Sequence, residues 1–131
     1  LSPKMNDGAS IMALTYYGST RYMQSYNVMG VAKAALETSI KYLAVDMGDR
    51  GIRVNAISAG PMRTLAGAVI NKSRKIYNYT IENSPIKKPL SLTDIGKSSV
   101  YLMSDLSKGV TGEILYVDNG YNKVGMSVQE L

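Results

Sequence analysis

Residues 25–58 read SYNVMGVAKAALETSIKYLAVDMGDRGIRVNAIS, and their order of helical and strand patterns indicates the fold class. Apolar residues recur at helical spacing, which predicts a helix over 25–47 with Ser25 as its N-cap. Gly48–Gly51 ends this helix, and 52–58 predicts a buried strand. The apolar helical positions are Met29, Ala32, Leu36, Ile40, Leu43 and Met47. A long helix leading into such a strand is typical of a parallel α/β sheet.

Two more strand patterns flank this unit. Residues 11–15 form a short apolar run, and residues 114–118 form another before Asn119-Gly120. Helices are expected over 66–83 and over 93–103, the second with Thr93 as its cap. The alternation predicts an α/β fold with a doubly wound parallel sheet and right-handed crossovers.

One helical pair has a predicted place on the surface. Glu37 and Lys41 are four residues apart, so they are expected to form an ion pair on the outer face of the long helix.

Length and composition limit the classes of protein. The chain has 131 residues, which suits one domain. It has no Cys and no His, so disulfide frameworks, thiolate chemistry, zinc sites and His-based triads are largely excluded. No apolar run approaches the roughly 20 residues that span a bilayer. The net charge of +5 is scattered along the chain, which argues against a nucleic-acid binder.

Tyr26 and Lys33 are the first candidate site. If both lie on one helix, their side chains are about 20° apart around the axis and roughly 10 Å apart along it. A phenol and an ammonium at that separation can grip one polar molecule between them. The lysine and the helix N-terminus would both favour a phenolate, which makes Tyr26 a better proton donor. The alternative is a chance pairing, because the chain has ten tyrosines.

Three motifs together resemble a known family. They are Tyr26-x-x-Met-x-x-x-Lys33, NAISAGPMRT at residues 55–64 and GEILYVDNG at residues 112–120. Their order and spacing resemble the C-terminal half of the short-chain dehydrogenase/reductase superfamily. Within it, the chain resembles the bacterial-type NADH-dependent enoyl-acyl-carrier-protein reductases over about residues 10–120.

The resemblance implies a Rossmann-like fold and a specific activity. Such enzymes reduce the 2,3 double bond of enoyl-acyl-carrier-protein thioesters with NADH in type II fatty-acid synthesis. The expected partners are acyl carrier protein and, in a cytoplasmic homotetramer, further copies of the same chain.

The resemblance also assigns catalytic roles. Tyr26 would hydrogen-bond the thioester oxygen and stabilise the enolate, and Lys33 would hold the hydroxyls of the nicotinamide ribose. Tyr16 would lie near the thioester. Ordinary carbonyl reductases of the superfamily use Tyr-x-x-x-Lys. The extra helical turn here, roughly 5.4 Å, suits an oxygen two carbons from the hydride acceptor.

The motif after the second strand implies cofactor contacts. In the family, Ala59, Gly60, Pro61 and Met62 pack along the nicotinamide, and Thr64 binds the pyrophosphate. Gly60 would let the backbone approach a ring, and Pro61 would fix its direction. The alternative is an ordinary strand-ending turn.

Two substrate-side assignments also follow from the resemblance. Met29 would contact substrate or nicotinamide, although core packing is the more frequent role of a helical Met. Lys72, Arg74 and Lys75 fall in the segment that matches the family's mobile substrate-binding loop, and would attract the acidic carrier protein. Their alternative is a solvated helix face.

Nothing in the chain resembles the Gly-rich first turn that cradles a dinucleotide pyrophosphate. We therefore expect residues 1–131 to be the C-terminal catalytic half of one Rossmann-like domain, without its nucleotide-binding half. Alone, such a chain should be inactive and expose one edge of the 11–15 strand. Two other hypotheses stay open: a short-chain reductase acting on a ketone or imine, and a non-catalytic module that only associates with a partner.

Overall fold

The computed structural model describes residues 2–62 and 73–125. Three strands, β1 (Ser10–Thr15), β2 (Arg53–Ala59) and β3 (Ile114–Val117), form one sheet in the order β1-β2-β3. Both strand pairs are parallel, with Thr15 of β1 opposite Ser58 of β2. The predicted strands and the parallel α/β class are confirmed.

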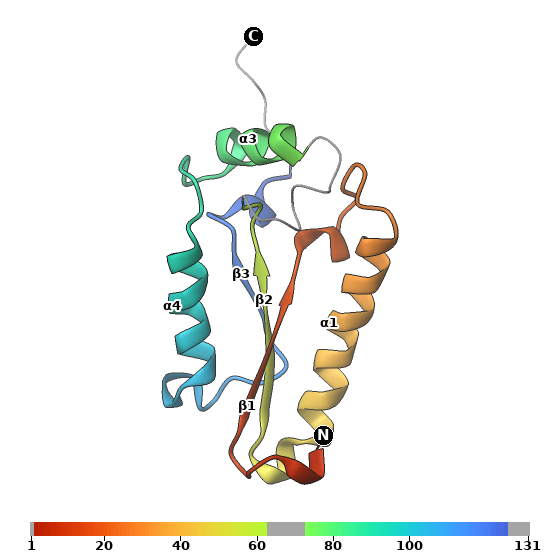
Figure 1. The fold of residues 1–131 in the computed structure, drawn as a ribbon, viewed down its shortest axis with the longest axis vertical. Coiled ribbons are helices and arrows are strands. Elements are labelled where there is room, and N and C mark those ends of the chain that lie inside the picture. The colour runs from red at the N-terminus through yellow and green to blue at the C-terminus, as the bar shows by residue number, and fades with distance from the viewer. Residues whose placement is uncertain (1, 63–72, 126–131) are drawn as a thin grey trace.

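Helices cover both faces of this sheet (Figure 1). The long helix α1 (Val28–Asp46) packs on β1 and β2, and α4 (Leu92–Met103) packs on the opposite face against all three strands. A third helix, α3 (Ser73–Asn83), lies across the end of the molecule to which the strands point. The result is a three-layer α/β/α arrangement, as expected for a Rossmann-like sheet.

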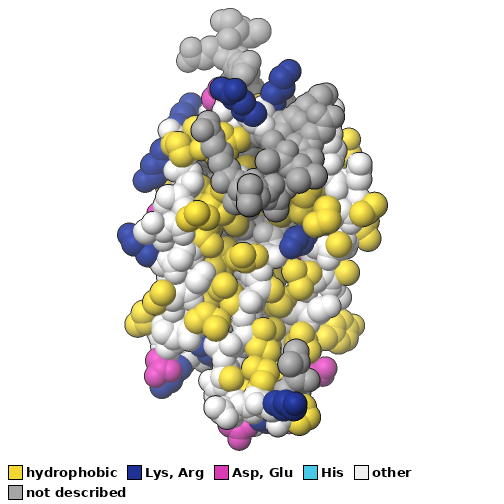
Figure 2. All heavy atoms as spheres, viewed as in Figure 1, with side chains coloured by type: hydrophobic (Ala, Val, Ile, Leu, Met, Phe, Trp, Pro, Cys, Tyr) yellow, Lys and Arg dark blue, Asp and Glu magenta, His cyan; other side chains and the backbone are white. Residues whose placement is uncertain are grey.

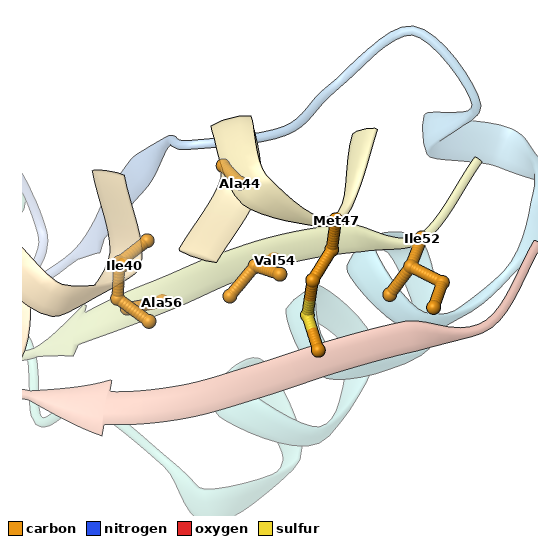
Figure 3. Close-up of a cluster of buried hydrophobic side chains, with 6 residues drawn as sticks. All are labelled: Ile40, Ala44, Met47, Ile52, Val54 and Ala56. Carbon is orange, nitrogen blue, oxygen red and sulfur yellow. The ribbon is translucent and has the colours of Figure 1, made fainter. Parts of the chain in front are cut away.

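Two hydrophobic clusters hold the layers together. The cluster between α1 and the sheet is drawn in Figure 3 and consists of Ile40, Ala44, Met47, Ile52, Val54 and Ala56. The cluster under α4 is built on Ile57, Ile95 and Leu102. Burying an aliphatic side chain of this size contributes about 1.5–3 kcal/mol, so these contacts supply most of the stabilisation of the layers.

The start of α1 differs from the prediction. The helix begins at Val28 with Asn27 in the N-cap position, and Ser25 lies outside it. Ser25 and Asn27 have φ angles of 65° and 46°, which are incompatible with helical backbone. The predicted Ser25 cap is therefore wrong.

The inward face of α1 also differs from the prediction. Met29 and Leu43, both expected in the core, are 47% and 39% exposed. Glu37 was expected on the outer face with Lys41, but it is only 8% exposed. The stripe that faces the strands is Lys33, Glu37, Ile40, Ala44 and Met47. A polar pair of residues thus occupies the N-terminal part of the buried stripe, where an apolar pattern predicted only core.

The N-terminal cap of α4 is formed by residues of its own first turn. Ser91, and not the predicted Thr93, caps α4, because the Ser91 hydroxyl accepts from the Asp94 N–H and the Asp94 carboxylate accepts from the Ser91 N–H. Hydrogen bonds from Ser91 lower the pKa of the Asp94 carboxyl below its usual range. The helix predicted over 66–83 is confirmed for 73–83, and 66–72 lies outside the described residues.

One edge of the sheet, along β1, is apolar and is not covered by the described residues (Figure 2). Strand β1 is an edge strand, and its Leu14 is 51% exposed. Figure 2 views the molecule from the side of this edge. It shows hydrophobic side chains gathered along the middle, over the strands between α1 and α4. In the described ranges, no helix is long and apolar enough to cross a membrane.

Candidate active site

Tyr16 and Tyr26 lie together where β1 ends. Tyr16 directly follows the strand, and a short 3-10 turn at Tyr17–Ser19 comes next. The rings of Tyr16 and Tyr26 meet edge to face, with centroids 5.0 Å apart and planes at 66°. This is a favourable aromatic geometry. The structure therefore brings together the two tyrosines that the sequence analysis singled out.

Two glycines allow this close approach. A Cβ at Gly18 would lie 2.6 Å from Cδ1 of Tyr26, and a Cβ at Gly30 would lie 2.8 Å from the Gly18 carbonyl oxygen. Because real Cβ atoms do not come so near, a side chain at either position would push apart the 17–19 turn, the Tyr26 ring and the first turns of α1. Gly18 and Gly30 thus set the position of Tyr26.

Tyr26 lies in a turn just before α1 and is not part of the helix. Its neighbours Ser25 and Asn27 have positive φ angles, and its carbonyl accepts the Met29 N–H at 3.0 Å. The predicted relation of Tyr26 and Lys33 on one helix is therefore wrong. The turn instead directs the Tyr26 ring against Tyr16.

Burial dominates the protonation of both tyrosines. Desolvation raises the pKa of Tyr16 well above its usual range, with smaller contributions from Tyr121, Tyr26 and Tyr17. Burial also raises the pKa of Tyr26. The expectation that Lys33 and the helix N-terminus would favour a phenolate is contradicted. Both side chains are therefore neutral phenols at physiological pH, able to donate a hydrogen bond.

Lys33 lies at the same end of β1. Its Nζ donates to the Leu14 carbonyl oxygen at 2.9 Å, which ties the first turns of α1 to the end of the strand. An ammonium has three donors, so two remain for other partners. Met29 is nearly half exposed and lies outside both core clusters of the described residues.

The turn after β2 carries the candidate cofactor contacts. The Gly60 N–H donates to the Val117 carbonyl oxygen at 2.9 Å, and a Cβ at Gly60 would lie 3.0 Å from the Asp118 Cα. Glycine is thus required here because the ends of β2 and β3 pack closely. The sequence analysis explained Gly60 by a close approach of the backbone to a cofactor ring. The contact with Asp118 is a second reason for glycine at this position.

The neighbouring residues of this turn have separate environments. Ala59 and Met62 are partly buried and pack against the cluster under α4. Pro61 is partly buried at the sheet end. Thr64 and Lys72 lie outside the described residues. Arg74 and Lys75 are exposed in the first turn of α3, at the end of the molecule where Figure 2 shows several basic side chains.

Comparison with known proteins decides the family. A family model described as enoyl-(acyl carrier protein) reductase matches residues 1–122. The chain belongs to this family.

Relatives within the enoyl-(acyl carrier protein) reductase family are close in sequence. The chain is 60% identical over 122 residues to enoyl-[acyl-carrier-protein] reductase [NADH] 1 of Rhizobium meliloti, covering 93% of this chain and 45% of that protein. It is 55% identical to the NADH reductase FabI of Rickettsia typhi, covering 94% and 47%. The chain thus spans about half the length of the curated relatives it matches.

Solved structures of the family give the same picture. FabI from Candidatus Liberibacter asiaticus is 58% identical with a TM-score of 0.87, and covers 91% of this chain and 46% of its own. The reductase from Anaplasma phagocytophilum, in complex with NAD, is 52% identical with a TM-score of 0.91, and covers 98% and 49%. The fold is therefore that of about half of each of these reductases.

One residue of this candidate site was missed by sequence reasoning. Glu37 accepts hydrogen bonds from Thr15 and Ser19, the residues on either side of the Tyr16–Gly18 segment. A signal was present, because Glu37 is four residues after Lys33 and shares its helix face. If Lys33 points toward the strands, Glu37 must do so as well.

A second missed group is the Ser58 hydroxyl. Ser58 lies at the C-terminal end of β2, opposite Thr15 of β1 and Tyr116 of β3, and is only 1% exposed. Within the described ranges its Oγ has no hydrogen-bond partner. Among the same residues, no group of His, Cys, Asp or Glu could hold a metal ion.

Proposed function

We propose that these residues form the catalytic half of an NADH-dependent enoyl-acyl-carrier-protein reductase of type II fatty-acid synthesis. The observation that carries this is the contact of Tyr16 with Tyr26 at the carboxyl end of β1, where Lys33 also binds the strand. Open α/β sheets bind their ligands at that end. The names of the close relatives support the same substrate class.

In the proposed mechanism, Tyr26 stabilises developing charge. NADH, when bound, supplies a hydride to the β-carbon of the enoyl thioester. The neutral phenol of Tyr26 donates a hydrogen bond to the thioester oxygen, where negative charge then develops. Tyr16 packs against the Tyr26 ring, and its own hydroxyl would lie near the same thioester. Met29, exposed beside this turn, contacts the substrate or the nicotinamide.

The residues present are compatible with the cofactor. Lys33 keeps two donors for the ribose hydroxyls after binding the Leu14 carbonyl. The unpaired, buried Ser58 hydroxyl lies at the same end of the sheet. Residues 59–62 comprise the last residue of β2 and the turn after it, and would line the nicotinamide, and Thr64 would bind the pyrophosphate.

The direct test is an assay of a completed enzyme. We define this as residues 1–131 joined to the part of the Rhizobium meliloti relative that the chain does not match, which by resemblance is its N-terminal half. With NADH, it should reduce a crotonyl thioester and leave a 3-ketoacyl thioester unchanged. Reduction of the ketone alone would favour a short-chain carbonyl reductase. Absence of both reactions, with NADH bound, would favour a non-catalytic module.

A prediction concerns the carrier protein. Exposed Arg74 and Lys75 at the start of α3 are proposed, with Lys72, to attract acidic acyl carrier protein. Reversing Arg74 and Lys75 to Glu should lower the rate with carrier-bound substrate severalfold and leave that with crotonyl coenzyme A unchanged. The defect should shrink with salt, because the Debye length falls from about 10 Å at 0.1 M to 3 Å at 1 M.

A matched control exists on other helices. Lys41→Glu with Lys97→Glu changes the net charge equally at exposed positions of α1 and α4, and should spare both substrates. Equal losses with both substrates in the α3 variant would indicate a disturbed loop and would contradict steering.

The proposed assembly is a homo-oligomer, a tetramer by resemblance. In support, the outer face of α1 exposes the apolar side chains Val28, Val31, Tyr42 and Val45. Such a stripe is typical of a helix that another surface covers. The proposed location is the cytoplasm, and it rests on the family resemblance alone.

A further inference from the structure

The carboxylate of Glu37 is buried between α1 and the segment that follows β1. Its Oε1 accepts a hydrogen bond from the Thr15 hydroxyl at 2.6 Å and another from the Ser19 hydroxyl at 2.5 Å. Only 8% of Glu37 is exposed. None of the ion pairs found in residues 2–62 and 73–125 includes it.

A buried carboxylate without a cation is costly, and an apolar residue would stabilise this position more simply. The two hydroxyl donors offset the cost, since hydrogen bonds to a charged acceptor are roughly twice as strong as neutral ones. Beyond stability, the two hydrogen bonds fix the position of the segment between Thr15 and Ser19. Thr15 is the last residue of β1 and Ser19 is the last of the 3-10 turn, so one oxygen of α1 holds both ends of the intervening segment.

The segment held in this way carries the site. It consists of Tyr16, Tyr17 and Gly18, and Gly18 supports the Tyr26 ring so closely that no Cβ would fit between them. Tyr16 contacts the same ring from its edge. A shift of the 15–19 segment therefore moves both tyrosines, although the hydrogen bonds of Glu37 go to Thr15 and Ser19 and not to the tyrosines.

We propose that Glu37 is a positioning residue: through Thr15 and Ser19 it fixes Tyr16 and the Tyr26 ring at the thioester. This inference rests on the proposed reductase function. Misplacement of a catalytic group by about 1 Å can cost about 10²-fold in rate, so the effect belongs mainly to kcat.

The test uses the completed enzyme and compares two substitutions of Glu37. Glu37→Ala removes the acceptor and should lower kcat with crotonyl thioester by about 10–10²-fold, with the Kd for NADH little changed. Glu37→Gln keeps an oxygen that can accept from both hydroxyls, and should restore most of the activity. Thr38→Ala, an exposed neighbour on α1, is the matched control and should behave as wild type.

A double-mutant cycle separates positioning from general stability. If Glu37 acts through Tyr26, Glu37→Ala should cost far less in a Tyr26→Phe background than in wild type. Equal costs in the two backgrounds, or unchanged kcat in Glu37→Ala, would overturn the proposal. Should Glu37→Ala fail to fold, Ser19→Ala removes one donor and is put through the same cycle with the same criteria.

A measurement without turnover keeps the two proposals apart. In Glu37→Ala, the ring resonances of Tyr16 and Tyr26 should shift in NMR spectra, because loosening the 15–19 segment changes the contact between the two rings. Unchanged ring resonances would contradict the positioning role even in an inactive protein. A wild-type completed enzyme that reduces no enoyl thioester would instead contradict the proposed function.

Discussion

Tyr26→Phe in the completed enzyme is expected to lower turnover of crotonyl thioester by roughly 10²–10³-fold, the usual cost of one lost oxyanion donor. The ring itself should stay in place, because Gly18 and Tyr16 contact its carbons and not its hydroxyl. The Kd for NADH should therefore be little changed. Steady-state kinetics together with a fluorescence titration of NADH measures both quantities.

Two other tyrosines make this experiment specific. Tyr22→Phe, at a residue that is 88% exposed, should be silent. Tyr16→Phe removes the hydroxyl of the other tyrosine of the pair. It measures how much of the turnover depends on the Tyr16 hydroxyl. If Tyr26→Phe stays within a few-fold of wild type while Tyr16→Phe does not, Tyr16 is the donor and the proposed roles are exchanged.

Lys33→Ala should raise the Kd for NADH by about 10–10²-fold, because each hydrogen bond to a charged group contributes about 1.5–3 kcal/mol and 1.4 kcal/mol is tenfold. Lys33→Arg should be partly tolerated, since a guanidinium still supplies donors to a ribose. Isothermal titration or NADH fluorescence gives the affinity directly. Lys41→Ala, two turns farther along α1 and exposed, is the control.

The Leu14 contact adds a second consequence of this change. Lys33 also ties α1 to the end of β1, so Lys33→Ala should slightly lower the thermal midpoint. The loss of stability and the loss of NADH affinity can be separated with Lys33→Arg, because an arginine can keep the contact with the Leu14 carbonyl. Unchanged NADH affinity in the alanine variant would leave Lys33 as a structural residue only.

Much of the fold was predictable from local patterns. The runs at 11–15, 52–58 and 114–118 are strands within a residue or two, and the long helix and the Gly51 turn were expected. The family resemblance implied that Tyr16 and Tyr26 both lie at the thioester, and the structure shows that their rings are in contact. The roles of these residues, and of Lys33, stay predictions.

The failures have a common physical origin. Ser25 fits the composition of a helix cap, yet the positive φ angles on both sides of Tyr26 delay the helix to Val28. Glu37 fits an exposed i, i+4 pair, yet it turns inward to Thr15. For Glu37, the hydrogen bonds with Thr15 and Ser19 outweigh the few tenths of a kcal/mol that an i, i+4 ion pair contributes. For Tyr26, the contact of its ring with Gly18 and Tyr16 accompanies the late start of the helix.

The sequence by itself therefore determined the order of the elements and the parallel sheet, because apolar periodicity and Gly/Pro breaks act over a few neighbouring residues. The tertiary structure alone decided which way Glu37 points, that Tyr26 precedes α1, and why Gly60 is glycine. These features depend on contacts between residues up to 58 positions apart, as with Gly60 and Asp118. No local pattern encodes such a distance, so only the packed sheet and its helices could show them.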